Sequence, residues 1–147
     1  MTATQAPAVG DLLPELTFEV TATFVVSTAI ATRDFQDVHH DRDAAVARGS
    51  KDIFLNILTT TGLVQRCVTD WAGRRARVRG VKVRLGVPCY AGDTLVLAGR
   101  VVEVGPAVRD GSGSGVGSGD GGEVVVEVIG RCGLGDHVTG RVRVVWA

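Results

Sequence analysis

The feature that most constrains this fold is a long segment that is apolar on nearly every side. From Ile53 to about Trp71, apolar residues recur at helical spacing and predict one helix, which Ser50 or Asp52 is placed to cap. A helix without a polar face is stable only when other structure surrounds it, so the rest of the chain must wrap around this segment. Its predicted face consists of Ile53, Phe54, Ile57, Leu58, Val64, Val68 and Trp71, with Leu55, Leu63 and Cys67 beyond it.

Strands are predicted on both sides of this helix in the sequence. Before it, Thr17–Ala29 is rich in β-branched and aromatic residues, which favours a strand. After it, apolar and polar residues alternate in four segments, Arg74–Val87, Thr94–Val104, Glu123–Arg131 and His137–Trp146. In the first of these four the alternation changes phase at Gly80, which predicts a β-bulge there. The connections are too short for helical crossovers, so the sheet is predicted to be antiparallel.

A polar stretch, TRDFQDVHHDRDAAVARG, separates the first predicted strand from the long helix. Asp41 is placed to cap a short helix that runs through Arg48, and Gly49 is placed to end it. One long buried helix, one short helix and about five antiparallel strands indicate an α+β architecture, the hotdog fold, in which the sheet curls around the long helix. Such a sheet leaves a face and an edge uncovered, so these units are expected to pair, with the active site between them.

The length and charge of the chain limit its class. Its 147 residues fit a single domain, with residues 1–16 as a loose lead-in and the Gly/Ser-rich residues 105–122 as a flexible hairpin tip. Sixteen basic residues balance sixteen acidic ones, so no overall field attracts nucleic acid or an anionic membrane. We expect a soluble, cytoplasmic protein, because no targeting signal or membrane span is apparent.

The cysteines give no sign of a metal site or a disulfide framework. Cys67, Cys89 and Cys132 are odd in number and form no C-x-x-C pair. We therefore expect buried free thiols, and neither a metal ion nor a cofactor.

Candidate catalytic groups gather in the polar stretch, where His39 and His40 stand among four aspartates. A shared metal ion is disfavoured, because neighbouring residues rarely face one ion in regular structure. Two interpretations remain from the pattern alone. The side chains are either caps and solvated charges, or one Asp and one His perform acid/base chemistry on a shared water. The third histidine, His137, starts the last predicted strand near a turn and is expected at the surface.

This stretch resembles the hydratase motif of the MaoC-like (R)-specific enoyl-CoA hydratases, a hotdog family with the pattern G-D-x-N-P-x-H. Asp34 stands at the aspartate of the motif and His39 at its histidine, with the same spacing. Arg33, Gln36 and Asp37 replace the glycine, asparagine and proline of the motif. A second segment, GVPCYAGDTLVLAGRV, is also similar to the family, and the likeness covers roughly residues 10–147 outside the glycine-rich insert.

Several shorter segments are similar to one branch of this family, the small subunits of heteromeric hydratases that act on steroid side chains. They are RDFQDVHHDRD, GSKDIFLNIL, TGLVQR, TDWAG and LGDHVT. The resemblance implies a larger MaoC-like partner subunit in an α2β2 heterotetramer. It also implies a steroid enoyl-CoA substrate, the unsaturated side-chain CoA thioester of a 3-oxo-steroid. Contact of the complex with a downstream aldolase is a further expectation.

The resemblance makes Asp34 and His39 the expected catalytic pair, which would hold one water next to the double bond. Asn56 takes the place of a family glycine near the start of the central helix, where its backbone N–H could bind the enolate oxygen. Arg77 and Arg79 belong to a run of cations that is either a solvated strand face or a site for the CoA phosphates. Two other functions remain open, a non-catalytic structural subunit of the same complex and an acyl-CoA thioesterase.

Overall fold

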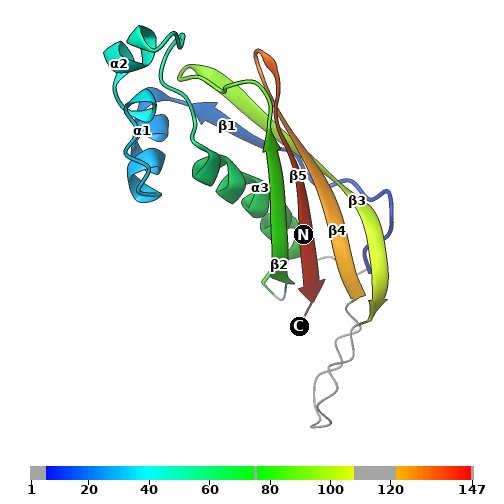
Figure 1. The fold of residues 1–147 in the computed structure, drawn as a ribbon. Coiled ribbons are helices and arrows are strands. Elements are labelled where there is room, and N and C mark those ends of the chain that lie inside the picture. The colour runs from blue at the N-terminus through cyan, green and yellow to red at the C-terminus, as the bar shows by residue number, and fades with distance from the viewer. Residues whose placement is uncertain (1–5, 75, 108–121, 147) are drawn as a thin grey trace.

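The computed structural model describes residues 6–74, 76–107 and 122–146. In these residues a curved sheet packs against one long helix (Figure 1). The sheet has five strands in the order β1-β3-β4-β5-β2, and every neighbouring pair is antiparallel. This is the predicted hotdog arrangement. The strands are β1 (Leu16–Val20), β2 (Ala76–Leu85), β3 (Asp93–Ala107), β4 (Gly122–Cys132) and β5 (Gly135–Trp146).

The core lies between the concave face of the sheet and helix α3 (Ile57–Ala72). Val64 and Val68 are fully buried on the side of α3 that faces the sheet. A glycine at position 140 of β5 permits this close approach, because a Cβ there would lie 2.8 Å from Val64 Cγ1. The helix and the sheet therefore bury each other on one side of α3. The expectation that other structure surrounds the whole helix is wrong for the single chain, because the opposite side is exposed at Ile57, Leu58, Gln65, Arg66 and Asp70.

A β-bulge near Gly80 changes the pairing of β2 with β5, as the phase change in the sequence predicts. Val78 pairs with Val144 and Gly80 with Arg143, so Arg79 is the additional residue of the bulged strand. Residues on both sides of the bulge can then direct their apolar side chains to the core.

The predicted strand at Thr17–Ala29 is wrong in its second half, where the chain forms helix α1 (Ala22–Ala31). The Thr21 side chain caps this helix by accepting a hydrogen bond from the Phe24 N–H at 3.0 Å. Val25 and Ala29, one helical turn apart, are the buried residues of α1. Capping and burial at helical spacing override the strand propensity of the β-branched residues.

The long helix begins at Ile57, four residues after its predicted start, because residues 53–55 are extended. The Leu55 N–H donates to the Cys89 carbonyl oxygen, and the Ala91 N–H donates to the Ile53 carbonyl oxygen, both at 3.0 Å. The predicted face is wrong at its first turn as well. Ile57 and Leu58 are about half exposed, at 49% and 52%. The buried residues of α3 are Thr59, Thr60, Leu63, Val64, Cys67 and Val68.

Two short helical elements lie between α1 and α3. Helix α2 (Arg42–Ala47) has the predicted Asp41 cap, and a 3-10 turn, η1 (Asp37–His39), precedes it. Of the predicted lead-in, the backbone around Leu13 hydrogen-bonds to β3. The predicted flexible tip at 105–122 falls mainly on residues 108–121, outside the described residues. No helix in the described part of the chain is long and apolar enough to span a membrane.

Candidate active site

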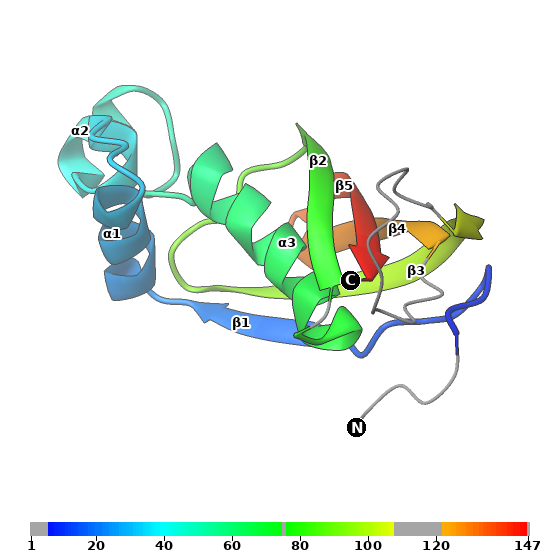
Figure 2. The ribbon, with the colours of Figure 1, turned by 90° about the horizontal axis from the view of Figure 1, so that it is seen from below.

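Asp34 is positioned by the way in which α1 ends. The Asp34 N–H donates to the Ala29 carbonyl oxygen and the Arg33 N–H donates to that of Ile30, which is a Schellman motif. Arg33 occupies its left-handed position with φ 58°, at the place where the resembling motif has glycine. The turn brings the Asp34 carboxylate next to the first turn of α3, at the end of the helix that α1 and α2 flank (Figure 2).

His39 is held in a fixed orientation inside the fold. Its side chain is buried, and its ring packs edge-on against Phe54 with a centroid separation of 4.9 Å. His39 Nδ1 lies 2.8 Å from the Phe54 carbonyl oxygen. A carbonyl oxygen only accepts hydrogen bonds, so Nδ1 carries the proton and Nε2 of the neutral ring has a free lone pair.

Asp34 and His39 face each other as a pair. His39 Nε2 lies 3.6 Å from Asp34 Oδ2, and the Asp34 side chain is 18% exposed. This separation exceeds that of a good hydrogen bond, so both acceptor atoms remain available to one small molecule between them. The pair can thus hold a water and take a proton from it.

Asn56 links both ends of this site. Its Oδ1 caps α3 by accepting from the Thr59 N–H at 2.9 Å. Its Nδ2 donates to Asp34 Oδ2 at 3.1 Å and to Thr32 Oγ1 at 2.8 Å. With all three groups satisfied at 3% exposure, the Asn56 side chain orients the Asp34 carboxylate, a task that the sequence did not indicate. These three bonds all involve the Asn56 side chain, and the backbone N–H, for which the oxyanion role is expected, takes no part in them.

Three other polar residues of the segment, Asp37, Asp41 and His40, have structural partners. Asp37 forms an ion pair with Arg48 at 2.7 Å, and Asp41 caps α2. His40 Nε2 donates to the Phe35 carbonyl oxygen at 3.1 Å, within the loop. An ion pair, a cap and a loop hydrogen bond therefore account for these three side chains.

His137 is buried, not on the surface as predicted. It is 2% exposed, with Nδ1 2.7 Å from the Val87 carbonyl oxygen and Nε2 2.9 Å from Thr60 Oγ1. The prediction failed because the start of β5 hydrogen-bonds to the backbone of residues 86–87, and the imidazole ring bonds to Val87 and Thr60. Burial lowers the pKa of His137 below its ordinary value, against smaller opposing effects of the Val87 carbonyl and Asp93.

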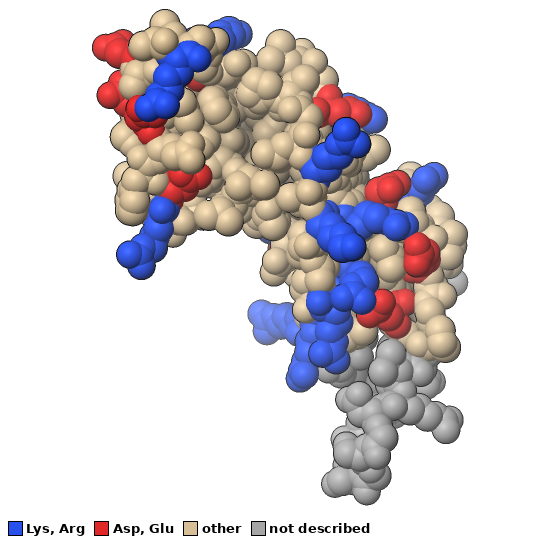
Figure 3. Space-filling view, in the orientation of Figure 1, with Lys and Arg blue, Asp and Glu red and all other residues tan. Residues whose placement is uncertain are grey.

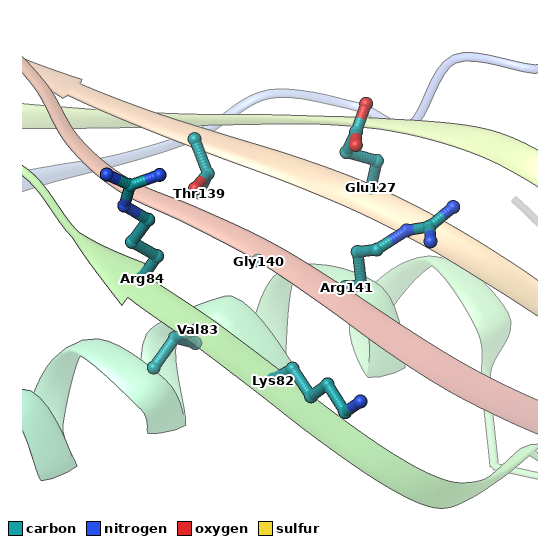
Figure 4. A pocket seen from close by; sticks show the side chains of 7 residues that line it. All are labelled: Lys82, Val83, Arg84, Glu127, Thr139, Gly140 and Arg141. Carbon is teal, nitrogen blue, oxygen red and sulfur yellow. The ribbon is translucent and has the colours of Figure 1, made fainter.

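Arg77 and Arg79 lie away from the dyad in this chain. They are exposed on β2, which follows the C-terminal end of α3, whereas Asn56 marks its N-terminal end. The 16 residues of α3 span about 24 Å. Lys and Arg side chains gather over β2 and β5 (Figure 3). A shallow depression on this outer face of the sheet contains no dyad residue (Figure 4), and its lining is Lys82, Val83, Arg84, Glu127, Thr139, Gly140 and Arg141.

Two known proteins are similar to this chain, one in sequence and one in both sequence and fold. A curated relative, the 3-oxo-4,17-pregnadiene-20-carboxyl-CoA hydratase beta subunit of Mycobacterium tuberculosis (strain ATCC 25618 / H37Rv), is 58% identical over 134 residues, which are 91% of this chain and 92% of the relative. A chain in the crystal structure of the ChsH1-ChsH2 complex from Mycobacterium tuberculosis is 55% identical and matches with a TM-score of 0.80, covering 95% of this chain and 98% of that one.

A more distant match shows the same fold. The (R)-hydratase from A. caviae involved in PHA biosynthesis matches with a TM-score of 0.76 at 18% identity, over 98% of this chain and 100% of the other. The family model described as MaoC like domain matches residues 5–119. Since that match covers most of the sequence, and the hydratase beta subunit is similar along nearly its whole length, this chain belongs to the MaoC-like domain family.

Proposed function

We propose that this chain is the catalytic subunit of an enoyl-CoA hydratase that adds water to the α,β-unsaturated side-chain CoA thioester of a 3-oxo-steroid. The observation that carries the proposal is the pair of buried His39 and partly buried Asp34, whose facing atoms Nε2 and Oδ2 are 3.6 Å apart. The name of the 58% identical relative supports the substrate class. A merely structural subunit would have no need of a carboxylate oxygen and an imidazole nitrogen that face one another without a hydrogen bond between them.

The proposed reaction follows from the chemistry of the thioester. Its carbonyl group withdraws electrons from the double bond, so water oxygen bonds to the β-carbon and a proton bonds to the α-carbon. Asp34 Oδ2 and His39 Nε2 hold the water, and the dyad takes one of its protons as the C–O bond forms. The dyad then delivers that proton to the α-carbon and returns to its starting state. Such acid/base assistance contributes about 10² to 10⁴ in rate.

The N-terminus of α3 is the proposed site for the enolate oxygen. The first N–H groups of a helix have no partner inside the helix, and the helix dipole favours negative charge there. The Asn56 side chain occupies the Thr59 N–H, and the Thr60 N–H bonds to the Asn56 carbonyl oxygen. The N–H groups of Asn56, Ile57 and Leu58 are not used by these two bonds, and in this proposal those of Asn56 and Ile57 supply the donors, next to the carboxylate that Asn56 orients.

A larger MaoC-like partner completes the proposed enzyme as an α2β2 heterotetramer. Apolar side chains near the dyad are exposed in the single chain, with Phe35 at 65% and Leu58 at 52%. Exposed apolar groups at the mouth of a site are typical of a surface that a partner or an apolar substrate covers. The similar chain of the ChsH1-ChsH2 complex comes from a two-component assembly. The proposed setting is the cytoplasm, with an aldolase downstream that contacts the complex.

The test is hydration of the steroid enoyl-CoA by this chain co-purified with its partner. Asp34→Asn and His39→Ala are each expected to lower the rate by about 100-fold or more while the complex stays assembled. His40→Ala is the matched control, because His40 is the exposed neighbour that bonds only within the loop. Assembly is checked by size-exclusion chromatography for every variant.

The outcomes of this test distinguish a catalytic hydratase subunit from a structural subunit and from a thioesterase. If both dyad variants retain activity in intact complexes, this chain is a structural subunit and the proposal is wrong. Release of free CoA thiol without hydrated product would instead identify a thioesterase. Loss of hydration in the dyad variants alone, with His40→Ala active, supports the proposal.

A further inference from the structure

A second group of chemically reactive side chains lies outside the dyad. It consists of Cys89, Asp93 and Cys132, which we name the thiol cluster. Each contributes one possible ligand atom, and the three atoms lie within 4.8 Å of one another. Cys89 is fully buried, whereas Asp93 and Cys132 are partly buried. Cys89 lies in the loop before β3, Asp93 is the first residue of β3, and Cys132 is the last residue of β4. Cys132 is far from the other two in the sequence, so no short spacing motif reveals the cluster.

We propose that the thiol cluster binds one Zn²⁺ ion through the two cysteine sulfurs and the Asp93 carboxylate, with water as the fourth ligand. Thiolate and carboxylate ligands in a tetrahedral arrangement suit zinc. Two sulfurs bound to one zinc lie about 3.8 Å apart, so the observed limit of 4.8 Å requires only a small contraction. The inference is independent of the proposed hydratase function.

The orientation of Asp93 supports this site. Asp93 Oδ2 accepts a hydrogen bond from the Tyr90 N–H at 3.0 Å, which fixes the carboxylate. The other oxygen faces the β4–β5 turn, because a Cβ on Gly133 would lie 3.5 Å from Asp93 Oδ1. Cys132 precedes Gly133 in this turn, and its Sγ lies 3.7 Å from the Pro88 carbonyl oxygen. One carboxylate oxygen is thus held by the backbone, the other lies beside the turn that Cys132 enters, and a carboxylate oxygen of Asp93 lies within 4.8 Å of both sulfurs.

The charges of the proposed site are close to balanced. Zinc binds cysteine as the thiolate, so each thiol gives up its proton when the ion binds, and the ion with two thiolates and one carboxylate carries a net charge of −1.

A zinc ion here would stiffen the support of the dyad. The Cys89 carbonyl oxygen accepts from the Leu55 N–H at 3.0 Å, and the adjacent Phe54 carbonyl oxygen holds His39 Nδ1 at 2.8 Å. The loop that carries Cys89 is thus hydrogen-bonded directly to the peptide segment that orients the His39 ring. The metal would fix that loop to the β4–β5 turn.

The first measurement is the metal content of the complex with its partner, purified under reducing conditions from zinc-containing medium. Wild type is expected to hold one more zinc per copy of this chain than Cys89→Ser/Cys132→Ser. Cys67→Ser is the matched control, because Cys67 is a buried thiol in α3 outside the thiol cluster and should leave the zinc content unchanged. Taking the difference between variants removes any metal that the partner holds.

A second measurement avoids dependence on the folding of the variants. After removal of metal by a chelator, the wild-type complex is titrated with Co²⁺ and then with Zn²⁺. We expect thiolate-to-cobalt absorption that Zn²⁺ abolishes, and release of two protons per zinc in weak buffer. Equal zinc contents in wild type and the double cysteine variant would overturn the proposal. So would the absence of thiolate-to-cobalt absorption in reduced wild type, or a Cys89–Cys132 disulfide that persists under reductant.

Discussion

His39 Nε2 lies 3.6 Å from Asp34 Oδ2, and the ring presents this nitrogen to the carboxylate because Nδ1 is bonded to the Phe54 carbonyl oxygen. The relationship depends on three backbone arrangements that come from different parts of the chain. The Schellman turn after α1 positions Asp34, the η1 turn positions His39, and the extended residues before α3 provide the carbonyl group. The acid/base pair is therefore set by the fold before any substrate arrives, which is what preorganised catalysis requires.

Asn56→Ser separates two tasks of one side chain. A serine still caps α3, so the thermal midpoint of the complex is expected to change little. The shorter side chain cannot reach Asp34, so the carboxylate loses a hydrogen bond, and kcat is expected to fall by about 10- to 100-fold. Asn56→Ala, which loses the cap as well, should show the same fall in kcat and a lower thermal midpoint. Unchanged kcat in the serine variant would show that Asn56 is only a helix cap.

Arg33→Gly is expected to stabilise the protein. Arg33 has φ 58°, a left-handed conformation that costs a residue with a side chain about 1 kcal/mol and costs glycine almost nothing. The thermal midpoint should rise while kcat stays unchanged, since the backbone at Asp34 is preserved. Gln36→Gly is the control. Gln36 has φ −65°, so glycine there should lower the midpoint. A lower midpoint in Arg33→Gly would mean that the arginine side chain contributes more than the strain costs.

The buried His137 predicts a loss of stability in mild acid. Its pKa is lowered in the folded state from an ordinary value of 6.5, mainly by burial. Above pH 6.5 the ring is neutral in both states. As the pH falls below 6.5, the unfolded state takes up a proton that the folded state resists, so the free energy of unfolding falls.

His137→Gln measures this contribution by comparison with wild type. The variant is expected to be less stable at pH 8, because the bonds to Val87 and Thr60 are perturbed, but its stability should depend less on pH below 6.5. Chemical denaturation at several pH values gives both slopes. Identical slopes would indicate that His137 does not control the acid sensitivity.

Replacing Arg77 and Arg79 tests whether the cations of β2 bind the CoA phosphates. If Arg77 and Arg79 bind the CoA phosphates, replacing both with alanine raises KM and weakens its dependence on salt. In this chain they lie at the far end of α3 from the dyad, so we expect KM to stay within about two-fold and its salt dependence to persist. A large rise in KM would mean that a neighbouring subunit brings the thioester to β2.

Local patterns in the sequence determined the parts of the fold that depend on near neighbours. The alternation of residues predicted the strands after the long helix and the bulge at Gly80. Asp41 predicted the start of α2, and the resemblance to the hydratase motif implied the pair of Asp34 and His39 that the structure brings face to face. These features follow from capping, periodicity and short motifs, which involve residues only a few positions apart in the sequence.

Tertiary contacts decided what the local patterns could not. Residues 53–55 are extended because they hydrogen-bond to residues near Cys89, so the helix starts later than its apolar pattern suggests. Packing made the β-branched residues of α1 helical, and contacts with residues 86–87 and with Thr60 of α3 buried His137. The task of Asn56 and the thiol cluster likewise join residues far apart in the chain. Their free energies arise from burial and from hydrogen bonds between distant segments, which no local window of the sequence contains.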